Sequence, residues 1–256
     1  MFFFKRKIIH LDCFTTESSV YELFPVDYSH KFYPDWWKKL PKQVNIPESQ
    51  DTNNLNIGFV PTMKSCIGFT EFYQNSITIP MWTDMLIKVN KEKNYYDTFF
   101  SDTKTKINKH FPRQMEGLID TQDYLHFKID SPWFFSCKND VRFSWTQPSW
   151  NFNPIDKIVI PPAIIDYKYQ IGTNINFFGK YVAENTKKDI LIEAGQPMVN
   201  IIPLSERKLK FHNHLIGEDE YNKIVMPYKT QNTFHSVYNS RKKFLDKKET
   251  KCPFGF

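Results

Sequence analysis

The clearest alternation of apolar and polar positions in the chain lies between residues 158 and 204. Short apolar runs are separated there by turn signals, and one run ends in Ala-Gly-Gln-Pro at residues 194–197. Short strands bounded by Gly, Pro, Asn and Asp residues are typical of antiparallel sheets. The pattern therefore predicts a compact antiparallel β unit in this stretch.

Further strands are predicted just before this unit, because several segments alternate or run apolar. These segments are residues 125–130, 133–137 and 141–146. Residues 138–140 read Lys-Asn-Asp and predict a hairpin loop. We place the β core at about residues 125–204. The pattern predicts a single, mainly β domain over residues 1–256, an antiparallel sandwich, β-clip or jelly-roll-like fold with a few short helices.

The flanking regions predict elements that pack against this core. Residues 7–14 alternate as a half-buried strand, and residues 77–89 predict either a strand pair or one strand bent at Pro80. Ser65 is a candidate cap for a short helix with an aromatic face. The spacing near the end predicts a C-terminal helix at residues 231–247 that docks on the sheet.

The last residues, 248–256, form a tail that is basic and then apolar. Such a tail is mobile unless something holds it. If it is held, Phe254 and Phe256 are the expected anchors, either on this chain or on a neighbour.

Composition supports a core built from rings. Aromatic residues make up 17% of the 256 residues, with 24 Phe, 13 Tyr and 6 Trp. Alanine is almost absent, which argues against a helical bundle. The four cysteines are far apart and form no CxxC pair, so we expect reduced thiols in the core rather than a zinc site or a disulfide framework.

The charge balance is mildly basic, with a formal net charge of +6. Its densest basic runs lie at the two ends, at residues 5–7 and 241–251, and are typical of solvated termini. Nucleic acid is therefore an unlikely partner. The sequence shows no membrane span and no secretory signal, because the N-terminal apolar run is short and precedes the charges.

Tryptophans are the candidate binding residues: Trp36, Trp37, Trp82 and Trp150. Exposed tryptophans can hold a sugar or a base by stacking. The adjacent pair at 36 and 37 has a simpler interpretation, which is a hydrophobic plug that closes one end of a sheet.

Histidines and an aspartate give a possible metal site. The spacing His10-x-Asp12 places two ligands on one face of a strand, and jelly-roll iron oxygenases use such a pair with a distant histidine. His212 and His214 have the same spacing and could bind zinc with a third ligand. Surface histidines in a polar segment are the commoner explanation, so we expect no metal and no cofactor.

No nucleotide-loop, lipase-type or zinc-protease motif occurs. The runs Ile-Asp-x-x-Tyr at residues 165–169 and Ile-x-Ile-x-x-Gly at residues 190–195 resemble the end of the β-clip of dUTP pyrophosphatases. The resemblance implies Asp166 as a water-activating base and Tyr169 as a ring beneath the sugar. The charged turn and the phosphate segment of that family have no counterpart here.

A second resemblance is to an uncharacterised group of proteins from tailed phages of marine bacteria. It rests on Pro-x-Trp-Trp-Lys-x-Leu-Pro at residues 34–41, Ile-Pro-x-Trp-x-Asp at residues 79–84 and Gly-x-Pro at residues 195–197. It implies a β-rich phage protein, located in the host cytoplasm or in a virion, and brings no catalytic residues. We therefore expect a non-enzymatic structural or interaction protein with protein partners or self-assembly. The alternative is a small-molecule enzyme, either nucleotide hydrolase-like or an Fe(II)-dependent oxygenase.

Overall fold

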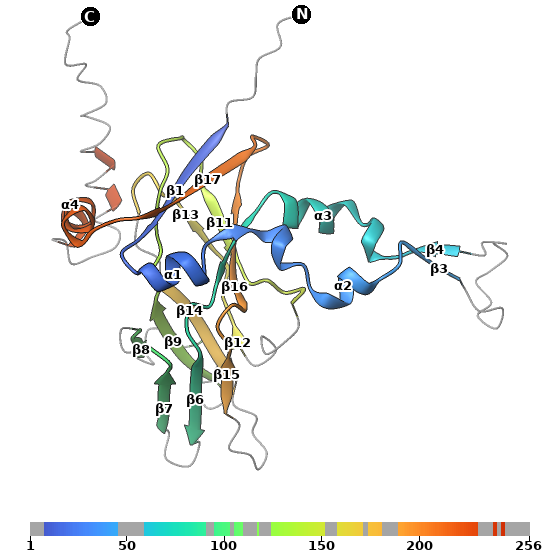
Figure 1. Cartoon of the computed structure of the whole chain (residues 1–256), viewed down its shortest axis with the longest axis horizontal. Helices are drawn as coiled ribbons and strands as arrows, with labels where there is room; N and C mark the ends of the chain where they lie inside the picture. Colours follow the sequence, from blue (N-terminus) through green and yellow to red (C-terminus); the bar gives the residue numbers. More distant parts are fainter. Residues whose placement is uncertain are drawn as a thin grey trace, which may run out of the picture.

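The structure of the chain is a computed structural model (Figure 1). It describes residues 8–45, 59–90, 95–102, 105–109, 117, 124–151, 158–170, 174–180, 189–229, 238–239 and 242–243. Within these residues the chain is mainly β, with five sheets and a few short helices, as the sequence predicts.

The largest sheet lies at the centre of the molecule. Its strands in spatial order are β13 (Ala163–Ile165), β11 (Phe143–Thr146), β16 (Pro197–Pro203), β5 (Ile77–Pro80) and β2 (Asp27–Tyr28). All neighbours in this sheet are antiparallel. Most of the β16 side chains are buried, so this strand is the middle of the core.

A second sheet joins the first and the last of the described strands. It contains β10 (Phe134–Ser136), β1 (Ile9–Thr15) and β17 (Leu209–Leu215). β1 is antiparallel to β10 but parallel to β17. Figure 1 shows β1 and β17 side by side, and a short helix follows each strand. These helices are α1 (Ser18–Leu23) and α4 (Glu218–Lys229).

Two smaller antiparallel sheets complete the β body. One contains β12 (Ile158–Val159), β14 (Asn174–Lys180), β9 (Tyr124–Asp130) and β8 (Ile107–Lys109). The other contains β15 (Ile190–Ile192), β6 (Met85–Asn90) and β7 (Tyr95–Phe100). A single cluster of buried side chains draws on these sheets and the two above, as expected for a sandwich-like fold.

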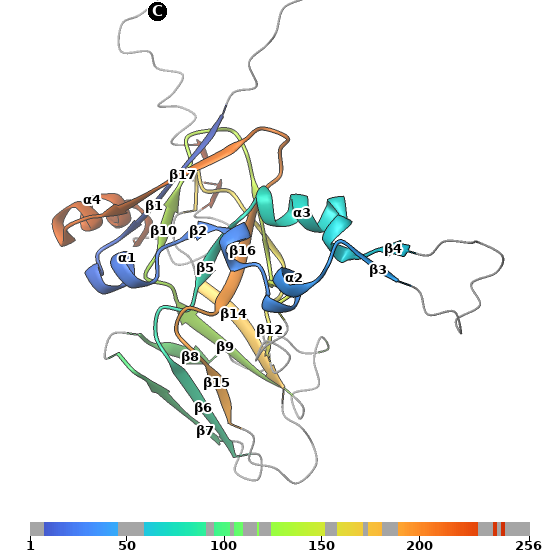
Figure 2. The same cartoon turned by 45° about the vertical axis from the view of Figure 1, so that its right-hand side comes forward.

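An arm projects from the body on the side opposite α4 (Figures 1 and 2). We define it as residues 29–45 and 59–75. It contains η1 (Ser29–Phe32), α2 (Asp35–Lys39), β3 (Gln43–Asn45), β4 (Phe59–Pro61), η2 (Met63–Ser65) and α3 (Ile67–Gln74). Among the described residues, its outer end consists of the antiparallel pair β3 and β4.

Several local predictions agree with the structure. The N-terminal strand forms as β1, and the helix expected after Ser65 forms as α3 with Phe69 and Tyr73 buried. Cys13 and Cys137 are buried free thiols, and burial raises the pKa of both thiol groups.

Two strand predictions need correction. The hairpin expected at residues 138–140 does not form, because β10 pairs with β1 whereas β11 pairs with β13 and β16. Residues 77–89 form neither a pair nor one bent strand, because β5 and β6 belong to different sheets. Local alternation predicts a strand but not its partner.

The predicted C-terminal helix lies mostly outside the described residues. Those that are described, 238–239 and 242–243, are helical. The tail at residues 248–256 lies outside the described residues, so its expected anchors do too.

Candidate functional site

The parallel pairing of β1 and β17 gathers the four residues proposed above as metal ligands. In this register His10 is opposite Lys210, and Asp12 is opposite His212. Alternate side chains of a strand leave the same face of a sheet. His10, Asp12, His212 and His214 therefore share the outward face, and we call them the histidine cluster.

The cluster consists of two diagonal pairs across the seam between the strands. His10 Nδ1 lies 3.3 Å from His212 Nε2, and the two ring planes are within 5° of parallel with centroids 5.6 Å apart. His214 Nε2 lies 2.9 Å from Asp12 Oδ1, as a hydrogen bond or an ion pair. The side chains of His214 and Asp12 are 47% and 43% exposed, so the pair is open to solvent.

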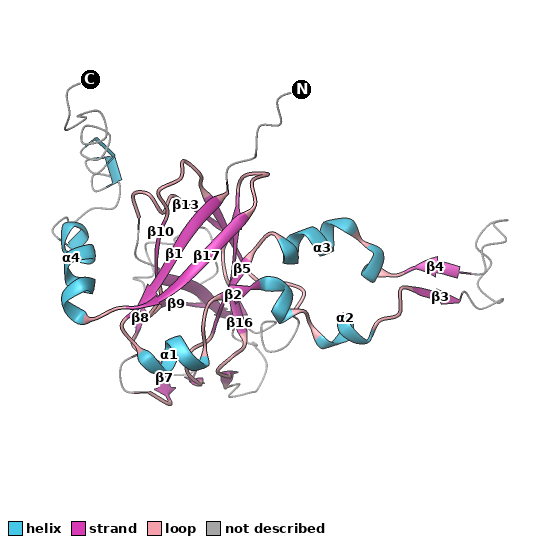
Figure 3. Ribbon diagram, turned by 45° about the horizontal axis from the view of Figure 1, so that its top comes forward, coloured by secondary structure: helices cyan, strands magenta, loops and turns pink. Residues whose placement is uncertain are grey.

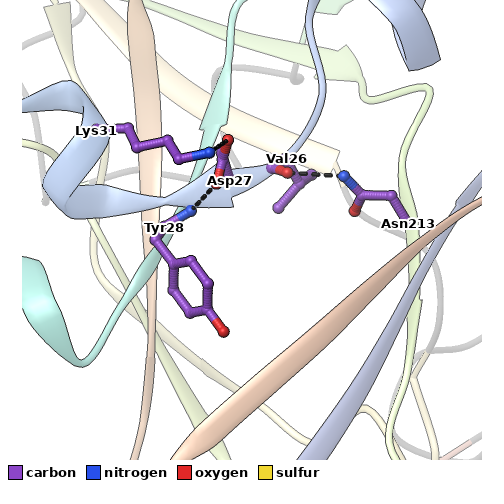
Figure 4. Close-up of polar contacts among 5 residues, drawn as sticks. All are labelled: Val26, Asp27, Tyr28, Lys31 and Asn213. Carbon is purple, nitrogen blue, oxygen red and sulfur yellow. Dashed lines mark hydrogen bonds and ion pairs between the residues drawn. The ribbon is translucent and has the colours of Figure 1, made fainter.

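The opposite face of the seam is anchored in the core. Ile9 and Leu11 of β1 are fully buried there. Asn213, between the two histidines of β17, points inward and donates a 2.8 Å hydrogen bond to the carbonyl of Val26 (Figure 4). The next residue, Asp27, accepts hydrogen bonds from the backbone N–H of Tyr28 and from the ammonium of Lys31. The backbone that carries His212 and His214 is thus tied to β2.

Aromatic side chains occupy the neighbouring part of the outward face. Phe14 stacks on Phe134, with ring centroids 5.9 Å apart, and Tyr221 of α4 packs edge-on against Phe134. Burial raises the pKa of the Tyr221 hydroxyl, and the nearby carboxylate of Glu218 adds to the effect. α4 therefore covers the apolar end of the face, next to the histidine cluster.

The cluster is not a complete metal centre as its rings stand. Among the residues that the structure describes, no group of three or more His, Cys, Asp or Glu side chains is placed to hold one ion. The arrangement offers two donor pairs on one exposed surface.

Three of the four tryptophans named as binding residues meet at the base of the arm. The indole N–H of Trp36 donates a 2.9 Å hydrogen bond to the carbonyl of Trp150. The ring of Phe69 contacts Trp36, Trp37 and Trp150, and Tyr33 stacks on Trp37 with centroids 4.0 Å apart. These rings pack against one another and join the arm to the body.

Trp82 has a different position from the other three. Its side chain is 6% exposed, and its N–H donates a hydrogen bond to the Thr105 hydroxyl. The ring belongs to the core, so the structure corrects its assignment as a surface binding residue.

The residues carried over from the dUTP pyrophosphatase resemblance lie in one turn after β13. The Asp166 carboxylate accepts a hydrogen bond from the backbone N–H of Lys168 and one from the hydroxyl of Tyr238. The ring of Tyr169 is 6% exposed and packs edge-on against Tyr238. Both residues stabilise the turn, and Tyr169 does not present its face to a ligand.

Comparisons with known proteins give no indication of function, so the functional argument rests on the geometry of this structure. No protein-family model and no curated protein matches this chain. Among the described helices, none has the length and apolar character needed to cross a bilayer.

Sequence reasoning found the four cluster residues but not their mutual contact. The two residues of each contact are 202 positions apart in the chain. The parallel register of β1 and β17 brings them together. The arm was missed as a unit, because its helices and strands are too short to give a distinct pattern. The sequence does change from aromatic to polar residues around position 42, which could have indicated that the chain leaves the core there.

Proposed function

We propose that the chain is a non-enzymatic structural protein that assembles with copies of itself through its arm. The observation that carries the proposal is the apolar surface of the arm. Ile67 is 74% exposed and Phe59 is 59% exposed, and Val44 and Met63 are exposed as well. Side chains of this size at the end of a projection are typical of surfaces that a partner covers.

The outer end of the arm also has little support of its own. β3 and β4 form a two-stranded ribbon, and every residue of β3 is exposed. A two-stranded ribbon in water is marginally stable without a surface to pack against. The aromatic rings at the base hold the arm in place, and a partner would stabilise its outer end.

Charge favours a second copy as that partner. The described part of the arm carries five lysines against one aspartate and one glutamate. The helices at the other side of the body begin with or contain exposed acidic residues: Glu22, Glu218, Asp219 and Glu220. Leu23 and Leu215 are exposed beside them. The surfaces are therefore complementary in charge, and each has an apolar part.

The two surfaces face away from each other, which determines the kind of assembly. α4 and the arm lie on opposite sides of the β body in all three overall views (Figures 1, 2 and 3). An arm that docks on the α1–α4 side of the next copy makes a head-to-tail contact, which closes into a ring or continues as a filament. The resemblance to marine phage proteins supports a place for such an assembly in a phage particle.

Sedimentation velocity and light scattering over a range of protein concentrations test the proposal. Wild-type chain should form oligomers whose size grows with concentration. Phe59→Asp combined with Ile67→Asp should leave a monomer. The matched control is Ile164→Asp, because Ile164 is 61% exposed but lies on β13, outside the arm.

A charge exchange identifies the partner surface. Lys39→Glu with Lys42→Glu should weaken assembly, and adding Glu218→Lys with Glu220→Lys should restore it. A wild-type chain that stays monomeric at every concentration contradicts the proposal, as does assembly that both arm variants leave unchanged. Rescue that fails while the arm variants dissociate the oligomer would place the partner surface elsewhere.

A further inference from the structure

We propose that the five-stranded central sheet holds one ordered water molecule beside the base of the arm, bound between Asn200 of β16 and Thr146 of β11. The ligand of this site is water, and each of the two side chains contributes a buried polar atom that needs a partner. The inference is independent of self-assembly, because the site lies inside the body and outside both docking surfaces used above. It rests on a row of polar residues that crosses the sheet.

The polar row occupies matching positions on four strands. Thr78 of β5 is opposite Asp27 of β2 on one side and opposite Asn200 on the other. Asn200 is in turn opposite Thr146. Directly opposite side chains lie on the same face of a sheet, so the four residues form one row. Thr78 is fully buried and Asn200 is 1% exposed, so their polar groups depend on hydrogen bonds within the fold.

The part of the row nearest the arm is fully bonded. The Thr78 hydroxyl lies 2.7 Å from the Ser29 hydroxyl and 2.7 Å from Asn200 Oδ1. The amide oxygen can only accept, so Thr78 donates its single proton to Asn200 and receives a proton from Ser29. Ser29 is the first residue of the arm, and its backbone N–H donates a 2.9 Å hydrogen bond to the carbonyl of Ser76. The row is therefore tied to the point where the arm leaves the body.

The other part of the row has two unpaired atoms. Asn200 Nδ2 and Thr146 Oγ1 are buried, and within the part of the chain that the structure describes neither has a hydrogen-bond partner. Asn200 Oδ1 is turned toward Thr78, so Nδ2 is turned away from it, and Thr146 is the next residue of the row on that side. Opposite side chains have Cβ atoms about 4.5–5.5 Å apart. The two unpaired atoms are therefore neighbours that a single small molecule can bridge.

Water fits these two groups better than an ion does. Nδ2 can only donate, which excludes a cation as its partner, whereas a hydroxyl can donate or accept. An anion would be buried without a counter-charge, because the row contains no lysine or arginine. A water oxygen accepts the proton of Nδ2 and forms a second hydrogen bond with Thr146. Buried waters typically make two to four such bonds.

The bridging water continues the chain of hydrogen bonds from the arm across the sheet. Thr146 is the last residue of β11 and leads into residues 147–151. In that segment the carbonyl of Trp150 accepts the hydrogen bond from the indole of Trp36. The water thus connects the first residue of the arm with the segment that holds its aromatic base, so both attachments of the arm belong to one hydrogen-bonded network.

A high-resolution crystal structure of the full chain is the direct test. We expect one ordered water between β11 and β16, about 2.7–3.2 Å from both Asn200 Nδ2 and Thr146 Oγ1. A direct hydrogen bond between the two side chains overturns the inference, and so does the absence of density for a water between them.

Thermal unfolding of Thr146→Val gives a second test through the sign of its effect. Valine keeps the branched shape of threonine but has no hydroxyl. If water bridges the two residues, valine takes one partner from the water, and the melting temperature should fall by about 2–4 °C. If the hydroxyl is instead unpaired, valine removes a buried polar group that has no partner. The melting temperature would then rise or stay the same, and either result overturns the inference.

The matched control is Ser144→Ala. Ser144 lies two residues before Thr146 on the same face of β11, but it is opposite Ile202 rather than Asn200. The variant should keep the water and lose less melting temperature than Thr146→Val does. Circular dichroism confirms that both variants fold. An equal fall in the two variants overturns the inference, because the effect would then not depend on the contact with Asn200.

Discussion

His10 Nδ1 lies 3.3 Å from His212 Nε2, although 202 positions separate the two residues in the chain. The contact exists because β1 and β17 run parallel, with His10 opposite Lys210 and Asp12 opposite His212. The side chain of His10 therefore reaches His212, which lies two residues beyond Lys210 on the same face of the sheet. A parallel pair requires a long connection between its strands. Here the connection contains most of the described chain, so this seam joins the first described strand to the last.

Asn213 maintains that seam from the inner face, which gives a stability prediction. Asn213→Ala removes the donor to the Val26 carbonyl and leaves that carbonyl without its side-chain partner. The free energy of unfolding should fall by about 1–3 kcal/mol, the usual cost of a buried polar group that loses its partner. Chemical denaturation measures the change. Asn222→Ala, at an exposed position of α4, is the control and should change stability little.

The fold class was predictable because it depends on local signals. Alternation in β1 and the apolar runs of β16 are set by which face of a strand is buried, and the sequence shows this directly. The partner of each strand is a long-range property. Lys138, Asn139 and Asp140 have the composition of a hairpin loop, yet the strands on either side of them join different sheets.

The candidate site divides in the same way. The residue types and spacings of His10 and Asp12, and of His212 and His214, singled out these four residues from the sequence alone. Their contact required the register of β1 against β17. For Trp82 the sequence was not sufficient, because nothing in its local sequence distinguishes a tryptophan of the core from one on the surface.

Gly195 adopts a conformation in the turn between β15 and β16 that other residues disfavour, whereas Gly68 does not. Replacing each by alanine should therefore change the free energy of unfolding in opposite directions. Its φ of +85° lies in the left-handed region, and its N–H donates a 2.7 Å hydrogen bond to the Met81 carbonyl. Gly195→Ala should lower the free energy of unfolding by about 1–2 kcal/mol, because a Cβ atom disfavours that conformation. Gly68→Ala in α3 should instead raise it by about 0.5–1 kcal/mol.

Gly68 is a suitable control because a Cβ atom there would meet nothing within 4 Å and its φ lies outside the left-handed region. Thermal and chemical unfolding of both variants measure the pair of effects. Equal changes in the two variants would show that the turn at Gly195 does not depend on its conformation.

Asn151 links the base of the arm to the body, and its loss should expose the arm to protease. Its side chain donates to the Phe32 carbonyl at 2.9 Å and accepts a 2.8 Å hydrogen bond from the Tyr73 hydroxyl. Asn151→Ala removes both links, so local opening of the arm becomes more frequent than opening of the body. Limited trypsin digestion followed by mass spectrometry should show faster cleavage at the lysines of α2.

Gln74→Ala is the control for this experiment, because Gln74 is exposed on α3 in the same arm. Its cleavage pattern should match that of the wild type. If Asn151→Ala accelerates cleavage equally in the arm and in the β body, the substitution destabilises the whole fold rather than the arm.

Buried tyrosines should make the fold sensitive to alkaline pH. Burial raises the pKa of the Tyr73 hydroxyl, with a smaller effect from Tyr33, and burial also raises the pKa of Tyr167. Above about pH 10 these groups ionise in the unfolded chain but stay protonated in the folded one. The unfolded state then binds fewer protons, so the free energy of unfolding falls as pH rises.

Tyr73→Phe tests how much of that fall one residue causes. At pH 8 the variant should be less stable than the wild type by about 0.5–1.5 kcal/mol, because the hydrogen bond to Asn151 is lost. The gap should narrow between about pH 10 and 11, because phenylalanine has no proton to lose in either state. Denaturant unfolding at matched ionic strength across this range measures the gap. A gap that stays constant with pH would mean that Tyr73 ionises equally readily in the folded and unfolded chain, and that its burial has no part in the alkaline loss of stability.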